Sequence, residues 1–210
     1  MKKYADSNFT DQEHQQLAQL KTPWKIQEFL DSIPYSIESR YRCPRSVLRD
    51  HKAHCYDGAV LAAATLQIIG YKPLLVEIIP NRHDDDHILA VFRNKTRWGA
   101  VAKSNFVGLR YREPVYRDLR ELIMSYFESY FNVDRERTMV GYTLPLNLNR
   151  FNALDWCTND WAMDIIANAL DLIRRYQVIS PALARKLNHV DARSYKAGLM
   201  DANPSGLYKP

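Results

Sequence analysis

The sequence is short of glycine and of cysteine, and both shortages narrow the class of protein. It has seven glycines in 210 residues and shows no internal repeat or low-complexity segment, so an ordinary globular chain is expected. Its three cysteines, Cys43, Cys55 and Cys157, are too few for a disulfide framework, and their number is odd. We expect all three thiols to remain reduced.

Long apolar runs and targeting signals are also lacking. Lys2 and Lys3 give the N-terminus a basic start, but no apolar segment of a signal peptide follows them. The longest apolar run, 59–70, includes Thr65 and Gln67 and is well short of the ~20 residues that span a bilayer. The sequence therefore predicts a cytoplasmic protein with no membrane partner.

A large excess of charge of one sign is absent as well. The formal charge is +5, the pI is about 9.0, and basic residues alternate with acidic ones along the chain. The segment 103–117 interleaves arginines with tyrosines, a pattern that could bind single-stranded nucleic acid, a carboxylate or a phosphate. Its arginines can equally pair with Glu113, Asp118 and Glu121 in a structural loop. Nucleic acid is therefore not expected as a partner.

Hydrophobic residues make up 46% of the chain, enough for the core of one domain spanning 1–210. Residues 1–21 are polar and predict a loosely packed N-terminal segment. Helical spacing of apolar residues and N-cap signals predict helices from Pro23, over 44–50, over 55–69, over 114–131, from Thr158 to about Tyr176 and from Pro181. Three strand-like segments, 73–79, 87–93 and 97–103, include a hairpin turn at 94–96.

This order of elements predicts an α+β fold. The helix over 55–69 is apolar around most of its circumference and should be buried, with Gly70 ending it. It is expected to pack on a small antiparallel sheet. Residues 114–200 are expected to form a helical C-terminal portion, and the last ten residues are expected to be frayed.

Cys55 is the first candidate for chemistry because it stands at the start of the buried helix. The free N–H groups of a first helical turn favour a thiolate and could also bind an oxyanion. Most free cysteines are, however, small buried hydrophobic residues.

His87 is the second candidate. It follows three aspartates, Asp84 to Asp86, and opens the second strand, and an imidazole can take a proton from a thiol and return it to a leaving group. The alternative is a surface histidine at the end of a strand.

The segments Ala53-His54-Cys55-Tyr56-Asp57-Gly58-Ala59, His87-Ile88-Leu89-Ala90-Val91-Phe92-Arg93 and Arg97-Trp98-Gly99-Ala100-Val101 together resemble the transglutaminase-like superfamily. This resemblance covers about a fifth of the chain, and the C-terminal half looks like companion regions of bacterial members. It implies a papain-like cysteine fold, with the cysteine heading a central helix and the histidine on a neighbouring strand. An acidic residue on the following strand orients that histidine in the family.

No aspartate stands where this third member is expected. Hairpin pairing places one of the residues 102–104 opposite His87, and a register shifted by one more residue reaches Asn105. The spacing usual in the family would place the third residue near Lys103, whose ammonium group cannot accept a hydrogen bond. Asn105 could accept one through its amide oxygen, and Ser104 could do so more weakly. Asn105 is therefore the predicted third member of the catalytic group, beside Cys55 and His87. The chain also lacks a glutamine before Cys55 that could serve as an oxyanion donor.

The sequence thus predicts a cysteine hydrolase or acyl transferase acting on amide or peptide bonds through Cys55, His87 and Asn105, with no cofactor and no metal. Because the orienting carboxylate is missing, a catalytically inactive binding module is one alternative. A metal-dependent hydrolase is another, since zinc accepts histidine, cysteine and aspartate side chains. Its candidate ligands would be His51, His54, Cys55, His83, Asp84, Asp85, Asp86 and His87.

Overall fold

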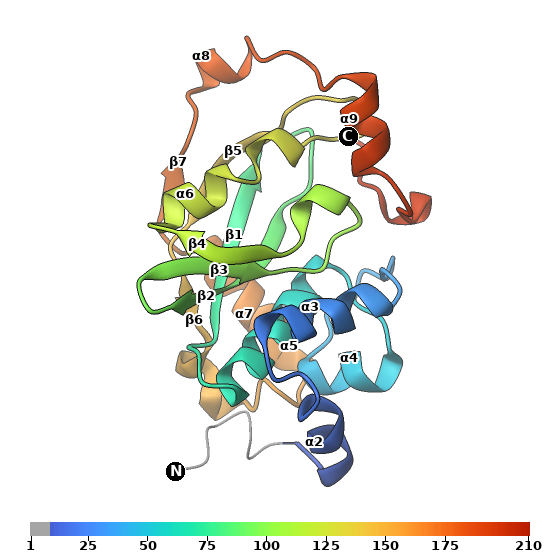
Figure 1. Ribbon diagram of the computed structural model, residues 1–210, viewed down its shortest axis with the longest axis vertical. Helices are drawn as coiled ribbons and strands as arrows, with labels where there is room; N and C mark the ends of the chain where they lie inside the picture. The colour runs from blue at the N-terminus through green and yellow to red at the C-terminus, as the bar shows by residue number, and fades with distance from the viewer. Residues whose placement is uncertain (1–8) are drawn as a thin grey trace.

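The computed structural model describes residues 9–210 and has an α+β fold built on one antiparallel sheet (Figure 1). The sheet has the strand order β4-β3-β2-β1-β5-β7, and β6 also pairs with β1. The strands are β1 (Leu74–Pro80), β2 (His87–Asn94), β3 (Arg97–Val101), β4 (Arg112–Tyr116), β5 (Met139–Thr143), β6 (Leu146–Asn147) and β7 (Arg175–Gln177). The predicted α+β class is therefore confirmed.

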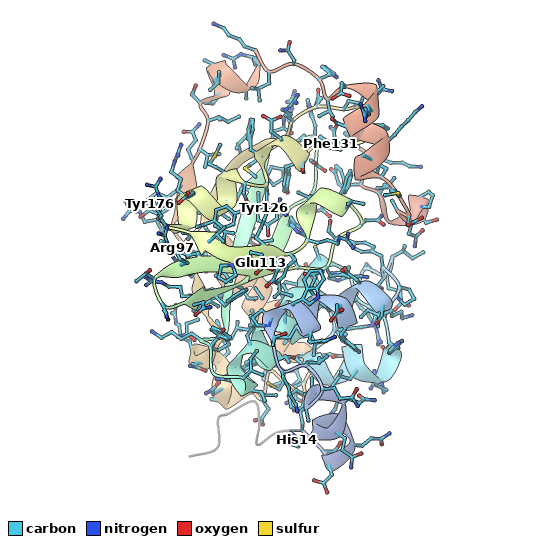
Figure 2. The ribbon with its side chains drawn as sticks, viewed as in Figure 1. His14, Arg97, Glu113, Tyr126, Phe131 and Tyr176 are labelled. Atoms are coloured by element: carbon cyan, nitrogen blue, oxygen red, sulfur yellow. The ribbon has the colours of Figure 1, made fainter. Side chains whose placement is uncertain are left out.

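Helices cover both faces of this sheet. The core on one face contains residues of α2 (Asp11–Leu17), α3 (Pro23–Ser32), α4 (Pro44–Asp50), α5 (Cys55–Ile68) and α7 (Trp161–Asp171), and α3 and α5 pack directly on the strands. The other face packs against α6 (Leu119–Met124) and its neighbours, including Tyr126 (Figure 2). Two further short helices, α8 (Pro181–Ala184) and α9 (Ala192–Gly198), follow β7. Period-2 alternation along the strands divides the apolar residues between these two cores.

Helix α5 is the centre of the larger core, as its all-round apolar surface predicts. Every residue from Tyr56 to Gln67 is buried. Gly58 lets α5 approach the segment just after β3 closely, because a Cβ atom there would lie 2.4 Å from the Cβ atom of Lys103. Gly70 adopts a φ of 112° just after the helix, a conformation that glycine takes readily, and this turn ends α5.

The β2–β3 hairpin fixes which residues of β2 face each core. Asn94 pairs with Arg97 across a two-residue turn, which is one residue shorter than the predicted turn. Ile88, Ala90 and Phe92 face α5, whereas Leu89 and Val91 face the α6 side. His87 has the same parity as Leu89 and therefore belongs to the α6 face.

The N-terminal segment packs more firmly than its polar composition indicates. Phe9, Leu17 and Leu20 are buried in the larger core, and Glu13 forms an ion pair with Arg45 at 2.8 Å. These three apolar residues anchor the segment, while most of the other described residues before Pro23 are exposed. Residues 1–8 lie outside the described residues.

The C-terminal portion is less helical than predicted. The helix expected over 114–131 is reduced to α6 and a 3₁₀ turn, and β5, β6 and β7 contribute strands to the sheet. Their pairing partners are far away in sequence, so local periodicity carries little sign of them. Among the described residues, no helix has both the length and the apolarity needed to cross a membrane.

Candidate functional site

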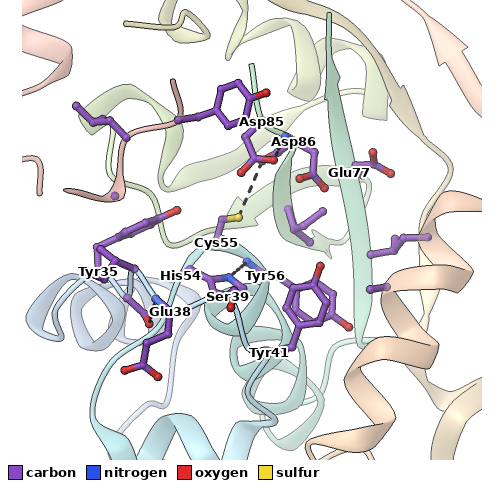
Figure 3. A pocket seen from close by; sticks show the side chains of 18 of the residues that line it. Tyr35, Glu38, Ser39, Tyr41, His54, Cys55, Tyr56, Glu77, Asp85 and Asp86 are labelled. Carbon is purple, nitrogen blue, oxygen red and sulfur yellow. Dashed lines mark hydrogen bonds between the residues drawn. The ribbon is translucent and has the colours of Figure 1, made fainter. Parts of the chain in front are cut away.

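The candidate site lies where α5 begins, next to the N-terminal end of strand β2 in the interior of the sheet. His54 is the N-cap of α5, and its side chain accepts a hydrogen bond from Tyr56 N at 3.2 Å. Cys55 follows as the first helical residue and is half-buried. The start of the helix therefore holds the thiol at the wall of a hollow of about 540 Å³ (Figure 3).

A buried charge network holds this helix start in place. Asp57 accepts hydrogen bonds from the main-chain N–H groups of Arg42 at 2.8 Å and His54 at 3.4 Å. The fully buried Arg42 guanidinium reaches Asp57 Oδ2 at 3.5 Å, Asp50 Oδ2 at 3.1 Å and Ser36 Oγ at 3.1 Å. The loop before α4 and the first turn of α5 are thus joined through one arginine.

The Cys55 thiol lies against the start of β2, and its surroundings keep it protonated. Its Sγ atom is 4.0 Å from the carbonyl oxygen of Asp86. Burial raises the pKa of the thiol far above its usual range, and the carboxylates of Asp86 and Asp85 raise it further. The thiolate expected from the helix N-terminus is therefore not favoured, because burial, reinforced by these carboxylates, opposes the effect of the helix N–H groups.

This electrostatic environment predicts slow alkylation of Cys55. At pH 7 iodoacetamide should modify Cys55 more slowly than a free thiol, and the rate should rise with pH, since only the thiolate reacts. Asp86→Asn removes one of the opposing charges, so it should lower the pKa of Cys55 and increase the rate several-fold at the same pH. Mass spectrometry of the peptides separates Cys55 from the buried Cys43 and Cys157. An unchanged rate in Asp86→Asn would show that its carboxylate does not act on the thiol.

The imidazole of His87 is buried on the α6 side and is oriented by a backbone carbonyl. Its Nε2 atom lies 2.7 Å from the oxygen of Leu109, which can only accept, so Nε2 carries the proton. Burial lowers the pKa of His87 to about 4, and Arg112 adds to this lowering against the opposing effect of the Leu109 bond. The ring is therefore neutral near pH 7, and Nδ1 keeps a free lone pair.

Cys55 and His87 line a common small cavity of about 60 Å³ at the start of β2. They reach it from opposite faces of the sheet, since α5 and the His87 ring belong to different faces. Within residues 9–210 no hydrogen bond joins the two side chains. The structure thus brings both residues to one cavity without joining them in an ion pair.

Asn105 occupies the same cavity wall but has other partners. Its Nδ2 donates to Asn203 O at 2.8 Å, and its Oδ1 accepts from Asn203 N at 2.7 Å. Both ends of the amide are used by one residue near the C-terminus. The orienting role expected of Asn105 is thus performed by the Leu109 carbonyl in this conformation, and Ser104 instead accepts a bond from Phe106 N at 3.0 Å.

Two features of the site were missed in the sequence. Tyr35 lines both cavities together with Cys55, and burial raises the pKa of its phenol so that the hydroxyl keeps its proton. The segment 205–208 lines the same hollow, so the last ten residues form part of its wall and are not frayed as expected. Neither feature has a local signal, because both contacts cross more than a dozen residues of chain.

The candidate ligands of the alternative metal site do not form a coordinating group, although Cys55, Asp84, Asp85, Asp86 and His87 line one cavity. The ring of His83 bonds to Glu136 at 2.8 Å, His51 packs edge-on against Phe29, and His54 caps α5. In the described part of the chain, no three histidine, cysteine, aspartate or glutamate side chains form a group that could hold a metal ion.

Comparison of the sequence with models of known protein families found no match, and comparison with curated proteins found none either. The function of the protein is therefore inferred from the chemistry of the site itself.

Proposed function

We propose that the protein is a cysteine-dependent hydrolase or acyl transferase of the transglutaminase-like type, acting on amide bonds. The observation that carries this proposal is the state of His87. Its Nε2–H is committed to the Leu109 carbonyl, so the unprotonated Nδ1 is available as a base, and the ring lines the same cavity as Cys55. A backbone carbonyl here would replace the side-chain orienting group of related cysteine sites.

The proposed reaction begins from a neutral pair. Nδ1 of His87 takes the thiol proton as Sγ of Cys55 forms a bond to the amide carbonyl carbon. The hydroxyl of Tyr35 and the main-chain N–H of Cys55 donate hydrogen bonds to the resulting oxyanion. When the C–N bond breaks, the imidazolium returns the proton to the leaving amine. Water, or a second amine, then attacks the thioester, releases the acid or the new amide, and restores the thiol.

The proposal is tested by trapping the acyl intermediate. The protein is mixed with p-nitrophenyl acetate, an activated acyl donor, and nitrophenolate release is followed while the peptides are examined by mass spectrometry. We expect an early burst and an acetyl group on the peptide that contains Cys55. Cys55→Ala should abolish the burst, because the thiol is the group that carries the acyl intermediate in this proposal. Acetylation elsewhere with the same burst in Cys55→Ala would contradict the proposal.

A second candidate, a non-catalytic binding module, is favoured by the raised pKa of Cys55 and by the missing hydrogen bond to His87. It predicts ligand binding in the 540 Å³ hollow without acylation of Cys55. The same trapping experiment separates the two candidates.

A further inference from the structure

The hollow beside Cys55 has a charge opposite to that of the protein. The chain carries a formal +5, yet the wall of the hollow contains no lysine or arginine among the described residues. It does contain five carboxylates, those of Glu38, Glu77, Asp85, Asp86 and Asp171. Negative charge is thus concentrated at one place on a basic molecule, which raises the local concentration of cations.

These carboxylates are not equally neutralised. Glu38 pairs with Arg42 and Lys52, and Asp171 pairs with Arg175 at 3.3 Å. Asp85 and Asp86 form no ion pair within the described residues. The pKa of Asp86 is raised by partial withdrawal of its carboxyl group from water, and the nearby charges of Asp85 and Glu77 add to the effect. The mouth of the hollow therefore holds acidic groups that repel each other and lack a counter-charge.

Glu77 indicates, independently of the cluster of acidic residues, that a ligand binds in the hollow. It is only 5% exposed, on the α5 face of β1, and it lines the hollow (Figure 3). Its Oε1 atom is 3.8 Å from Arg175, whereas its Oε2 atom has no hydrogen-bond partner among the described residues. A buried carboxylate oxygen without a donor destabilises the fold, and such groups are commonly completed by a bound partner.

Tyrosines complete the wall in a way that suits an organic cation. The rings of Tyr41 and Tyr56 lie 4.6 Å apart, and Tyr41 is 37% exposed to the hollow and solvent. An ammonium or guanidinium group can place its apolar stem on such rings while its N–H groups reach carboxylates. The volume of about 540 Å³ is in the range of small-ligand pockets.

We propose that this hollow is a specificity subsite for the guanidinium or ammonium group of a basic peptide, with Glu77 as the buried acceptor and Asp85 and Asp86 at its mouth. The assignment of this cation to a substrate rests on the proposed function of Cys55. A cation bound there also offsets the field of Asp85 and Asp86, which adds to the effect of burial on the Cys55 thiol. Binding of the correct substrate thus makes the nucleophile more acidic.

The test compares two ligands of nearly the same shape, acetyl-arginine amide and acetyl-citrulline amide, by isothermal titration calorimetry. The urea of citrulline lacks the positive charge, so we expect it to bind about tenfold more weakly or worse. Glu77→Gln should weaken binding of the arginine ligand by a similar factor. Asp86→Asn, at the exposed mouth, provides a second variant if Glu77→Gln does not fold.

Two controls keep this inference separate from the catalytic proposal. Glu128→Gln removes the same charge from a side chain that is 75% exposed and outside the hollow, and it should leave binding unchanged. Cys55→Ala should bind the arginine ligand as the wild type does, even if the wild type forms no acyl intermediate. Equal affinity for arginine and citrulline ligands, or wild-type affinity in both Glu77→Gln and Asp86→Asn, would overturn the subsite.

Discussion

Replacing His87 by glutamine should lower kcat/KM for an amide or ester substrate by about 10²- to 10⁴-fold, the usual contribution of a positioned general base. The glutamine amide can donate an N–H to the Leu109 carbonyl, as Nε2 of His87 does, but it cannot take a proton from Cys55. The loss is measured by steady-state kinetics with the substrate that acylates Cys55.

His87→Ala is the matched comparison. It removes the base and also leaves the buried Leu109 carbonyl without its donor, so it should lose stability, by about 1–3 kcal/mol, as well as activity. His87→Gln should lose activity while keeping most of its thermal stability. Wild-type rates in a folded His87→Gln protein would exclude the imidazole as the base.

The pH profile provides a further check on the role of His87. The base acts in its neutral form, and burial lowers its pKa to about 4, so the active form is present above about pH 5 and is lost below it. A cysteine site that depends on a histidinium–thiolate pair would instead lose activity on both sides of neutrality. We therefore expect kcat/KM, measured between about pH 3.5 and 5.5, to fall as the pH drops through about 4.

Replacing Arg42 by methionine should have the largest effect on stability. The guanidinium is fully buried and is the shared partner of Asp50 and Asp57, and Asp57 itself is buried. Removing one side of a buried ion pair costs about 3–5 kcal/mol, because the remaining charge is left without compensation. For a chain of this length, that loss corresponds to a fall in Tm of about 6–20 °C, measured by calorimetry or circular dichroism.

Arg49→Met provides the control for this prediction. Arg49 also pairs with Asp50, at 2.8 Å, but its side chain is 61% exposed, so its loss should leave Tm almost unchanged. The two variants remove the same kind of charge from the same aspartate at different depths. Equal Tm values for the two variants would show that the buried network does not stabilise the start of α5.

The predictions from sequence were most accurate where short-range rules apply. The alanine-rich run after Cys55, the glycine at 70 and the strand-like segment from His87 are local patterns, and α5 and β2 begin at these two residues. The sequence also drew attention to Cys55 and His87, which the fold brings to one cavity. Their proposed chemistry remains a prediction.

The hydrogen-bond partners of His87 and Asn105 could not be predicted from the sequence. The orienting group of His87 is a main-chain carbonyl, which every residue possesses and no side-chain pattern marks. Asn105 has the right chemistry for that role, but Asn203, 98 residues further along the chain, takes both ends of its amide. Strands β5 and β7 are likewise defined by pairing with distant strands more than by their own composition.

The sequence by itself determined the α+β class, the buried helix and the position of the thiol at its start, because helix periodicity, capping and turn chemistry act over a few residues. Only the tertiary structure decided that His87 meets Leu109, that Tyr35 approaches Cys55, and that acidic groups from separate segments surround one hollow. These relations depend on long-range packing, in which main-chain atoms and distant side chains meet without leaving a local pattern.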